Sequence, residues 1–503
     1  MEDKNRFSKL LEYLMSTAEL KNYTLAQELQ YDVSYISKWL SGRMLPSEKT
    51  EKKVLEGISR CIVDFAVDAG RETLLSDYQV DNAEELKMAI YDNLEAEYVY
   101  VREMQKNTGT GVTNKTFYYP EMTLPQYISR MRHPVLRRVK SLDIMASMDL
   151  MSIGHEYRLQ IARIEGENIR EERGYPDVHY SMLIDIQPDK WDYIHDTIFL
   201  INLLSYNAYI DFRFYGDSQA SGRMIFTVKD DYAVSGMLIS QDRCMGVVVS
   251  EETDNCNTLY RNIRVLCSRE RLLFRKTCML DMLTKHDYIH TMLSQNLRWI
   301  MGHMTEHFLP DDLFEEIMNE LDADGRLSVN KDELRNIHRL TRTIVEEASI
   351  KIMVYESAFS NLVVSNELDF FNHKVYLTAE QRSHYMEHFL KLCRKHENLE
   401  IRLIYGQFVS DFEYSDNQCV FLTDTVSYLR LGSRNARNNL LMINRADMRK
   451  IFEKSFEKFW NYSEGVVVSD KKMIISFIQH IVQGIDIVSR ITDGQISVQI
   501  DTI

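Results

Sequence analysis

Small hydroxyls, one aromatic ring and one cation follow each other closely in residues 33–41. In a helix over this range, the residues expected to face outward are Val33, Ser34, Tyr35, Ser37, Lys38 and Ser41. Serine, tyrosine and lysine side chains can reach base edges and phosphates when they project from a helix lying in the major groove of DNA. The chemistry that these residue types and spacings favour is therefore recognition of double-stranded DNA.

Two short helices joined by a tight turn would position these side chains. Thr24 with Gln27 three residues later predicts a capping-box start of the first helix, and Asp32 is expected to cap the second. Gly42 and Pro46 are expected to end that helix. Apolar residues at helical spacing would form the inner faces: Leu25, Ala26 and Leu29 in the first helix, and Ile36, Trp39 and Leu40 in the second.

The stretch YTLAQELQYDVSYISKWLSGRMLPS (23–47) resembles the helix-turn-helix of the Cro and phage-repressor class, also called XRE-like regulators, down to the ending I-S-K-W-x-x-G-x-x-x-P. This resemblance implies base contacts from Ser34, Tyr35, Ser37 and Lys38, and phosphate contacts from Asn22, Tyr23, Thr24 and Arg43. The turn departs from the family pattern, because Gln30 stands where glycine is usual. A left-handed residue with a Cβ costs about 1 kcal/mol. The alternative is a small helical bundle that binds protein.

A second candidate site lies in NQCVFLTDTVSYLRLGSRN (417–435). This stretch resembles the phospholipase D superfamily signature, H-x-K-x4-D-x6-G-S-x-N. Asp424 falls on the family aspartate, while Gly432, Ser433 and Asn435 fall on G-S-x-N one residue late. The family histidine falls on Asn417 and the family lysine on Cys419.

These two departures decide the expected chemistry. The family uses histidine as the nucleophile on phosphorus and lysine to hold the phosphate charge. An amide and a thiol do not replace both roles, and the corresponding stretch of the preceding half, GRMIFTVKDDYAVSGM, lacks H-x-K altogether. We therefore expect no enzymatic activity and a retained binding body. A small anionic effector could be held by Asp424, Ser433, Arg434, Asn435 and Arg437, although Arg434 and Arg437 could equally be solvated loop cations.

Metal and cofactor motifs are weak or missing. In ELDADGRLSVNKDEL (320–334), Asp322, Asp324 and Gly325 match positions of a calcium loop. The twelfth position, which needs a bidentate glutamate, is Lys331. We interpret the segment as a polar turn between helices. The sequence has no P-loop and no G-x-G-x-x-G after a strand, so no cofactor is expected.

Length and charge restrict the remaining possibilities. A chain of 503 residues suggests three or four domains. The net charge of −15 divides into +1 for residues 1–60 and −16 for the remainder, so DNA contact is expected only at the N-terminal head. The seven cysteines form no C-x-x-C pair, which argues against a zinc site. The N-terminus is charged and no apolar run reaches membrane-spanning length, so a cytoplasmic protein without membrane association is expected.

The predicted fold class is multidomain: an all-α helix-turn-helix head followed by a duplicated α/β body with a helical insert. The expected ranges are 1–60 for the head, 61–125 for a helical connector and hinge loop, 126–280 for α/β copy 1, 281–348 for the helical insert, 349–465 for α/β copy 2, and 466–503 for a C-terminal helix and strand. Both copies show the order strand–helix–strand–helix–several strands–helix. Residues 61–106 could be either a dimerisation arm or a packed connector. The basic segment 127–142 could be a solvated face or a second anion contact.

These features together favour a sequence-specific DNA-binding transcriptional regulator that acts as a homodimer, with a body that senses a ligand or carries the oligomer contact. Half-sites on DNA lie about one helical turn apart, which requires two linked heads. Two alternatives remain: a phosphodiesterase or nuclease of phospholipase D-like fold, and a scaffold whose head binds protein.

Overall fold

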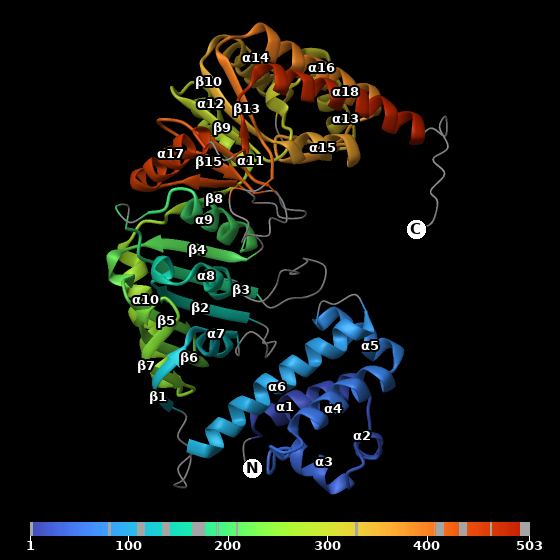
Figure 1. Ribbon diagram of the computed structural model, residues 1–503, viewed down its shortest axis with the longest axis vertical. Helices are drawn as coiled ribbons and strands as arrows, with labels where there is room; N and C mark the ends of the chain where they lie inside the picture. The colour runs from blue at the N-terminus through green and yellow to red at the C-terminus, as the bar shows by residue number, and fades with distance from the viewer. Residues whose placement is uncertain are drawn as a thin grey trace. The chain divides into compact units, whose positions relative to one another are not determined.

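Two compact units make up the chain, whose structure is a computed structural model (Figure 1). The first contains Met1–Asp185, Tyr209–Phe212 and Asp217–Arg269, and the second contains Ile186–Ala208, Arg213–Gly216 and Glu270–Ile503. The structure describes residues 4–78, 82–107, 116–132, 141–162, 177–187, 189, 191–207, 210–326, 330–406, 408, 417–431, 440–462 and 465–492. A helical region followed by two mixed α/β sheets confirms the predicted fold class.

Six helices form the head: α1 (Arg6–Thr17), α2 (Asn22–Leu29), α3 (Val33–Leu40), α4 (Glu51–Phe65), α5 (Asp68–Tyr78) and α6 (Ala83–Asn107). The long helix α6 packs along α1 and α4 (Figure 1). Its residues Leu86, Ile90 and Leu94 are fully buried. These apolar positions of α6 are thus buried inside this unit, whereas Phe65, Val67 and Met88, which also belong to residues 61–106, are exposed.

Close approaches between short side chains hold the head together. The Asn5 side chain caps α1 by accepting from the Ser8 N–H at 2.9 Å, and it donates to the Gly42 carbonyl at 3.0 Å. The Ser8 hydroxyl donates to the Trp39 carbonyl at 2.6 Å. The first helix therefore fixes the C-terminal end of α3 through two hydrogen bonds to its backbone.

The first sheet has seven strands in the order β1-β7-β6-β5-β2-β3-β4. The strands are β1 (Thr116–Thr123), β2 (Ser141–Met148), β3 (Asp177–Ile184), β4 (Asp211–Gly216), β5 (Arg223–Val228), β6 (Tyr232–Ser240) and β7 (Arg243–Ser250). Strands β2 and β3 are parallel, whereas β2–β5, β5–β6, β6–β7 and β7–β1 are antiparallel pairs. The first unit also contains α7 (Leu124–Arg132), α8 (His155–Ala162) and α10 (Thr253–Arg269). Strand β1 lies in the range expected as connector and hinge. The basic segment 127–142 begins within helix α7 and reaches strand β2. Its residues 133–140 lie outside the described ranges.

The second sheet has eight strands in the order β17-β13-β10-β9-β14-β15-β16-β8. They are β8 (Phe274–Thr277), β9 (Leu297–Met301), β10 (Ile350–Tyr355), β13 (Leu399–Ile404), β14 (Cys419–Leu422), β15 (Tyr428–Arg430), β16 (Leu440–Ile443) and β17 (Val467–Val468). Strands β9, β10 and β13 run parallel, and β14, β15 and β16 alternate in direction beside them. A separate hairpin consists of β11 (Glu367–Phe370) and β12 (His373–Tyr376).

The second unit also contains helices. They are α9 (His195–Tyr206), α11 (Met279–Thr284), α12 (Asp287–Met292), α13 (Asp311–Ala323), α14 (Lys331–Glu347), α15 (Glu356–Val364), α16 (Ala379–Lys395), α17 (Ala446–Trp460) and α18 (Lys471–Thr492). Helix α18 lies in the range for which a C-terminal helix was predicted, while the strand predicted after it lies outside the described residues. In the described ranges no helix combines the length and apolarity needed to cross a bilayer.

The prediction that residues 281–348 are helical throughout is wrong at one place. Strand β9 lies inside this range and pairs with β10 on one side and β14 on the other. Its sequence LRWIM is a short apolar run with neighbours on both sides, and periodicity cannot separate such a run from a buried helix segment. Asn296, with φ 53°, precedes the strand and Gly302 follows it, and both are signals of a strand boundary.

The calcium-like loop joins α13 to α14. Gly325 has φ 66°, and the Lys331 ammonium lies 2.5 Å from an Asp322 carboxylate oxygen. The cation thus occupies the place where a bidentate glutamate would hold calcium. Residues 327–329 are not described, and the described part of the chain contains no group of three acidic, histidine or cysteine side chains suited to a metal ion.

Candidate functional site

The helix-turn-helix predicted from residues 23–47 corresponds to α2 and α3. The first helix begins at Asn22 after Lys21, whose side chain makes no capping hydrogen bond. The predicted capping-box start, with Thr24 as the N-cap, is therefore wrong by three residues, because Lys21 is the N-cap. Glu19 has φ 54°, and the turn at this residue lets the helix begin before the predicted start.

The turn between the helices has the strained conformation expected of it. Gln30 has φ 57° and ψ 40°, so a side chain with a Cβ occupies a left-handed position. Asp32 then caps α3 by accepting from the Ser34 N–H at 2.9 Å. Hydrogen bonds from Ser34 lower the pKa of the Asp32 carboxyl. A negative charge at this helix N-terminus is favourable because it faces the positive end of the helix dipole.

Helix α3 has one buried face and one exposed face. Ile36 and Trp39 are buried, whereas Val33, Ser34, Tyr35, Ser37 and Lys38 are exposed and Ser41 is half-buried. The Tyr35 ring packs edge-on against Tyr31 at 5.7 Å between centroids, and the Lys38 ammonium lies 5.4 Å from the centre of the Tyr35 ring. The aromatic ring is thus held on the surface beside the cation.

The hydroxyls of the exposed face are only partly used. Ser37 Oγ donates to the Val33 carbonyl and Ser41 Oγ to the Lys38 carbonyl, each at 3.1 Å. Their oxygen atoms still have lone pairs that can accept a hydrogen bond.

The residues expected to hold phosphates lie at two helix ends. Asn22, Tyr23 and Thr24 occupy the first turn of α2, where backbone N–H groups have no partner within the helix. Tyr23 is 67% exposed, and Asn22 and Thr24 are half-buried. Arg43 follows α3 and is exposed. Polar residues at such positions are suited to contacts with a phosphate backbone, which fix the orientation of a protein on DNA.

The phospholipase-like positions are only partly described. Asp424 is exposed in the turn between β14 and β15, where its carboxylate accepts from the Asn296 amide at 2.6 Å. The Asn417 amide donates to the Ser357 hydroxyl at 2.8 Å. The other residues assigned to an effector site, namely Ser433, Arg434, Asn435 and Arg437, lie outside the described ranges together with Gly432.

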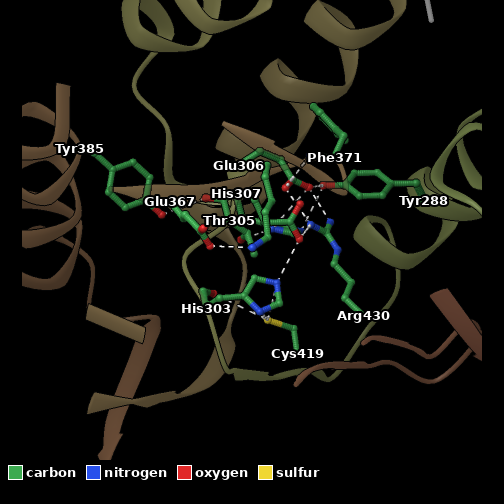
Figure 2. A network of polar contacts seen from close by, with 12 residues as sticks. Tyr288, His303, Thr305, Glu306, His307, Glu367, Phe371, Tyr385, Cys419 and Arg430 are labelled. Atoms are coloured by element: carbon green, nitrogen blue, oxygen red, sulfur yellow. Dashed lines mark hydrogen bonds and ion pairs between the residues drawn. The ribbon is translucent and has the colours of Figure 1, made fainter. Parts of the chain in front are cut away.

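A buried ionic network that the sequence did not predict lies beside Cys419 (Figure 2). Arg430 is 1% exposed and binds both carboxylate oxygens of Glu306, at 2.6 and 2.9 Å. The Tyr288 hydroxyl and the Phe371 N–H also donate to Glu306, at 2.8 and 3.2 Å. The guanidinium and the carboxylate pair through two parallel hydrogen bonds, while Arg430 Nε is buried without a hydrogen-bond partner among the described residues.

Paired charges control the protonation states in this network. Burial would raise the pKa of Glu306, but Arg430 outweighs it and holds that pKa below its ordinary value. Burial would also raise the pKa of Asp369, but Arg430 and His303 together outweigh burial and lower that pKa. Burial lowers the pKa of His307 to about 4, so this imidazole is neutral at neutral pH.

The outer end of the network contains a thiol, an imidazole and a carboxylate. His303 Nε2 lies 3.0 Å from Asp369 Oδ2, and Arg430 Nη1 donates to the same oxygen at 3.2 Å. Cys419 Sγ lies 3.5 Å from His303 Nε2 and 3.6 Å from its Nδ1. Asp369 lies on the hairpin strand β11, and its backbone N–H donates to the Met304 carbonyl at 3.0 Å.

These residues come from four separate segments, which explains why no motif revealed them. The one usable signal is the Gly302–His303 pair after the apolar run LRWIM, since a polar residue directly after a buried strand often lies at a site. Because the run LRWIM was predicted to be helical, Gly302 and His303 were not recognised as residues at a strand end.

Comparison with known proteins gives no family. No protein-family model matches the chain, and no curated protein matches it. A solved structure described as TrmBL2, an archaeal chromatin protein with a novel mode of DNA binding, aligns with 12% sequence identity and a TM-score of 0.22. The alignment covers 53% of this chain and 99% of that chain. A TM-score this low does not establish a shared fold.

Proposed function

We propose that this protein is a sequence-specific DNA-binding transcriptional regulator whose head binds double-stranded DNA through α3. The observation that carries the proposal is the exposed face of α3, on which Ser34, Tyr35, Ser37 and Lys38 project beside a two-helix turn. A polar face with one cation, set on a helix whose opposite face is anchored by Trp39, matches the requirements of a major-groove reader.

The proposal extends to the partners of the head. One head offers few phosphate contacts, so a single copy would bind weakly and lose affinity steeply as salt rises. We therefore propose a homodimer, with the body providing the oligomer contact and the site for a small anionic effector. Light scattering at micromolar concentration tests the first part, and a monomer that still binds DNA tightly would contradict it.

The test of the DNA-binding face is a double substitution, Tyr35→Ala with Lys38→Ala. Each base contact contributes about 1–3 kcal/mol, so affinity for a selected site should fall by roughly 30-fold or more. The site is first selected from random double-stranded DNA, and affinity is then measured by gel shift at fixed salt. Normal binding by a folded double variant would exclude this face.

A matched control comes from the second unit. Strand β12 carries an exposed lysine and an exposed tyrosine two residues apart, Lys374 and Tyr376. Replacing both with alanine removes the same side-chain types, and we expect unchanged DNA affinity. The phosphodiesterase alternative is tested in parallel with a chromogenic phosphodiester, DNA and RNA. We expect no turnover, and turnover that Asp424→Ala abolishes would favour the enzyme.

A further inference from the structure

The thiol of Cys419 lies at a topologically special point of the second sheet. From β9 the chain proceeds to β10 on one side, whereas β14 flanks β9 on the other. His303 follows the carboxyl end of β9, and Cys419 begins the neighbouring antiparallel strand, so both lie at the same edge. In open α/β sheets, ligands bind outside the carboxyl ends of strands where the connections diverge in this way.

The two strand ends approach each other unusually closely. A Cβ at position 302 would lie 2.0 Å from the Asn417 carbonyl oxygen, so only glycine permits this approach. The result is that His303 and Cys419 are neighbours although 116 residues separate them.

The imidazole of His303 contacts both the Cys419 thiol and the Asp369 carboxylate. Burial lowers the pKa of His303, but its contacts with Cys419 and Asp369 together outweigh burial and place that pKa well above its ordinary value, so this ring readily takes up a proton. Cys419 Sγ is almost equally distant from both ring nitrogens. The sulfur also lies 3.7 Å from the His303 carbonyl oxygen, to which the thiol can donate. An imidazole next to a cysteine can act as the base that takes the proton of the thiol, which activates the sulfur as a nucleophile.

We propose that Cys419 is a nucleophilic thiol that reacts with small hydroperoxides. The Cys419 thiolate attacks the terminal oxygen of the hydroperoxide, an S–O bond forms and the O–O bond breaks. The leaving oxygen takes the proton from His303, which becomes neutral. Cys419 is thereby oxidised to a sulfenic acid, and the hydroperoxide is reduced to water or an alcohol. Asp369 acts as a positioning residue for the ring. This inference does not depend on DNA binding by the head.

The other cysteines provide an internal contrast. Burial raises the pKa of Cys61 to about 11 and those of Cys244 and Cys393 to about 12, so these thiols stay protonated at neutral pH. Cys419 is also buried, but the His303 side chain next to it is 26% exposed. Because the Cys419 side chain is fully buried, we expect a small reagent to reach the sulfur more readily than a bulky one.

The experiment measures oxidation at each cysteine of the full-length protein. The protein is exposed to hydrogen peroxide for graded times and quenched with catalase. It is then unfolded in guanidinium containing dimedone and iodoacetamide, and the cysteine peptides are quantified by mass spectrometry. We expect dimedone labelling of Cys419 to build up at least about tenfold faster than labelling of Cys393. Cumene hydroperoxide, which is bulkier, should react more slowly than hydrogen peroxide.

Two variants test the role of the imidazole. His303→Gln should slow oxidation of Cys419 about tenfold, and Asp369→Asn should slow it less because the ring remains. Cys278→Ser removes the partly exposed cysteine and should leave the Cys419 rate unchanged. Each variant is first checked by its unfolding midpoint, and Asp369→Asn carries the test if His303→Gln does not fold. Oxidation of Cys419 at the Cys393 rate, or an unchanged rate in the folded variants, would overturn the proposal.

Discussion

The exposed face of α3 and the ionic network around Arg430 use polar residues in opposite ways. On α3, Lys38 and Tyr35 are exposed and contact mainly each other and Tyr31. In the second sheet, Arg430 is buried and bound by two carboxylates. Removing an exposed side chain should change binding and leave stability nearly intact, while removing a buried charge should do the reverse. The four predictions below test this difference, from the largest expected effect to the smallest.

Arg430→Met should give the largest loss of stability. It leaves Glu306 buried without its guanidinium partner, and such a change costs about 3–5 kcal/mol. Chemical denaturation followed by tryptophan fluorescence measures it, because Trp299 is buried near this network. The control is Arg335→Met, which removes another arginine bound to both oxygens of a carboxylate, that of Glu315, but on the surface. Similar losses in the two variants would mean that burial does not set the cost.

Trp39→Ala should unfold the head although it removes no DNA contact. The Trp39 side chain is 1% exposed, and truncating a buried tryptophan costs about 3–5 kcal/mol. Limited proteolysis should then cut within the first 65 residues. Tyr35→Ala is the counterpart on the other face of the same helix and should change stability by no more than about 0.5 kcal/mol. A head that resists proteolysis in Trp39→Ala would contradict the assignment of Trp39 to the core.

Acid should weaken the ionic network selectively. The folded-state pKa of Glu306 lies below its ordinary value of 4.5, so the stability it contributes is present above pH 4.5 and is lost as pH falls toward the folded value. His303 has the opposite sign, since its raised pKa gives stability below 6.5 that is lost as pH rises through the folded value. As the pH is lowered from 7 to 3, the denaturant midpoint of unfolding should fall more steeply in the native protein than in Glu306→Gln. Parallel curves would show that Glu306 does not control the acid response.

Gln30→Gly should give the smallest effect and the only gain in stability. Gln30 has φ 57°, and glycine adopts this conformation without the cost of about 1 kcal/mol carried by a side chain. The control is Gln27→Gly in the middle of α2, which should destabilise by about the same amount because glycine disfavours a helix interior. Thermal unfolding followed by circular dichroism measures both, and a loss of stability in Gln30→Gly would show that the glutamine side chain supports the turn.

The sequence by itself determined the elements whose signals are local. The two helices of the turn, the left-handed position at Gln30, the Asp32 cap and the inward positions of Ile36 and Trp39 all follow from residues within a few positions of each other. Helical spacing and caps act through contacts three or four residues apart, which a linear pattern records. The division of α3 into a buried and an exposed face could be predicted for the same reason.

Only the tertiary structure decided where β9 lies and what surrounds Cys419. The run LRWIM is apolar because its neighbours cover it, and those neighbours, β10 and β14, lie about 50 and 120 residues away in the sequence. Arg430 and Glu306 are likewise separated by 124 residues, and His303 and Cys419 by 116. No spacing rule links residues at such distances. Their meeting depends on strand order and on one close backbone approach at Gly302, which are properties of the folded sheet.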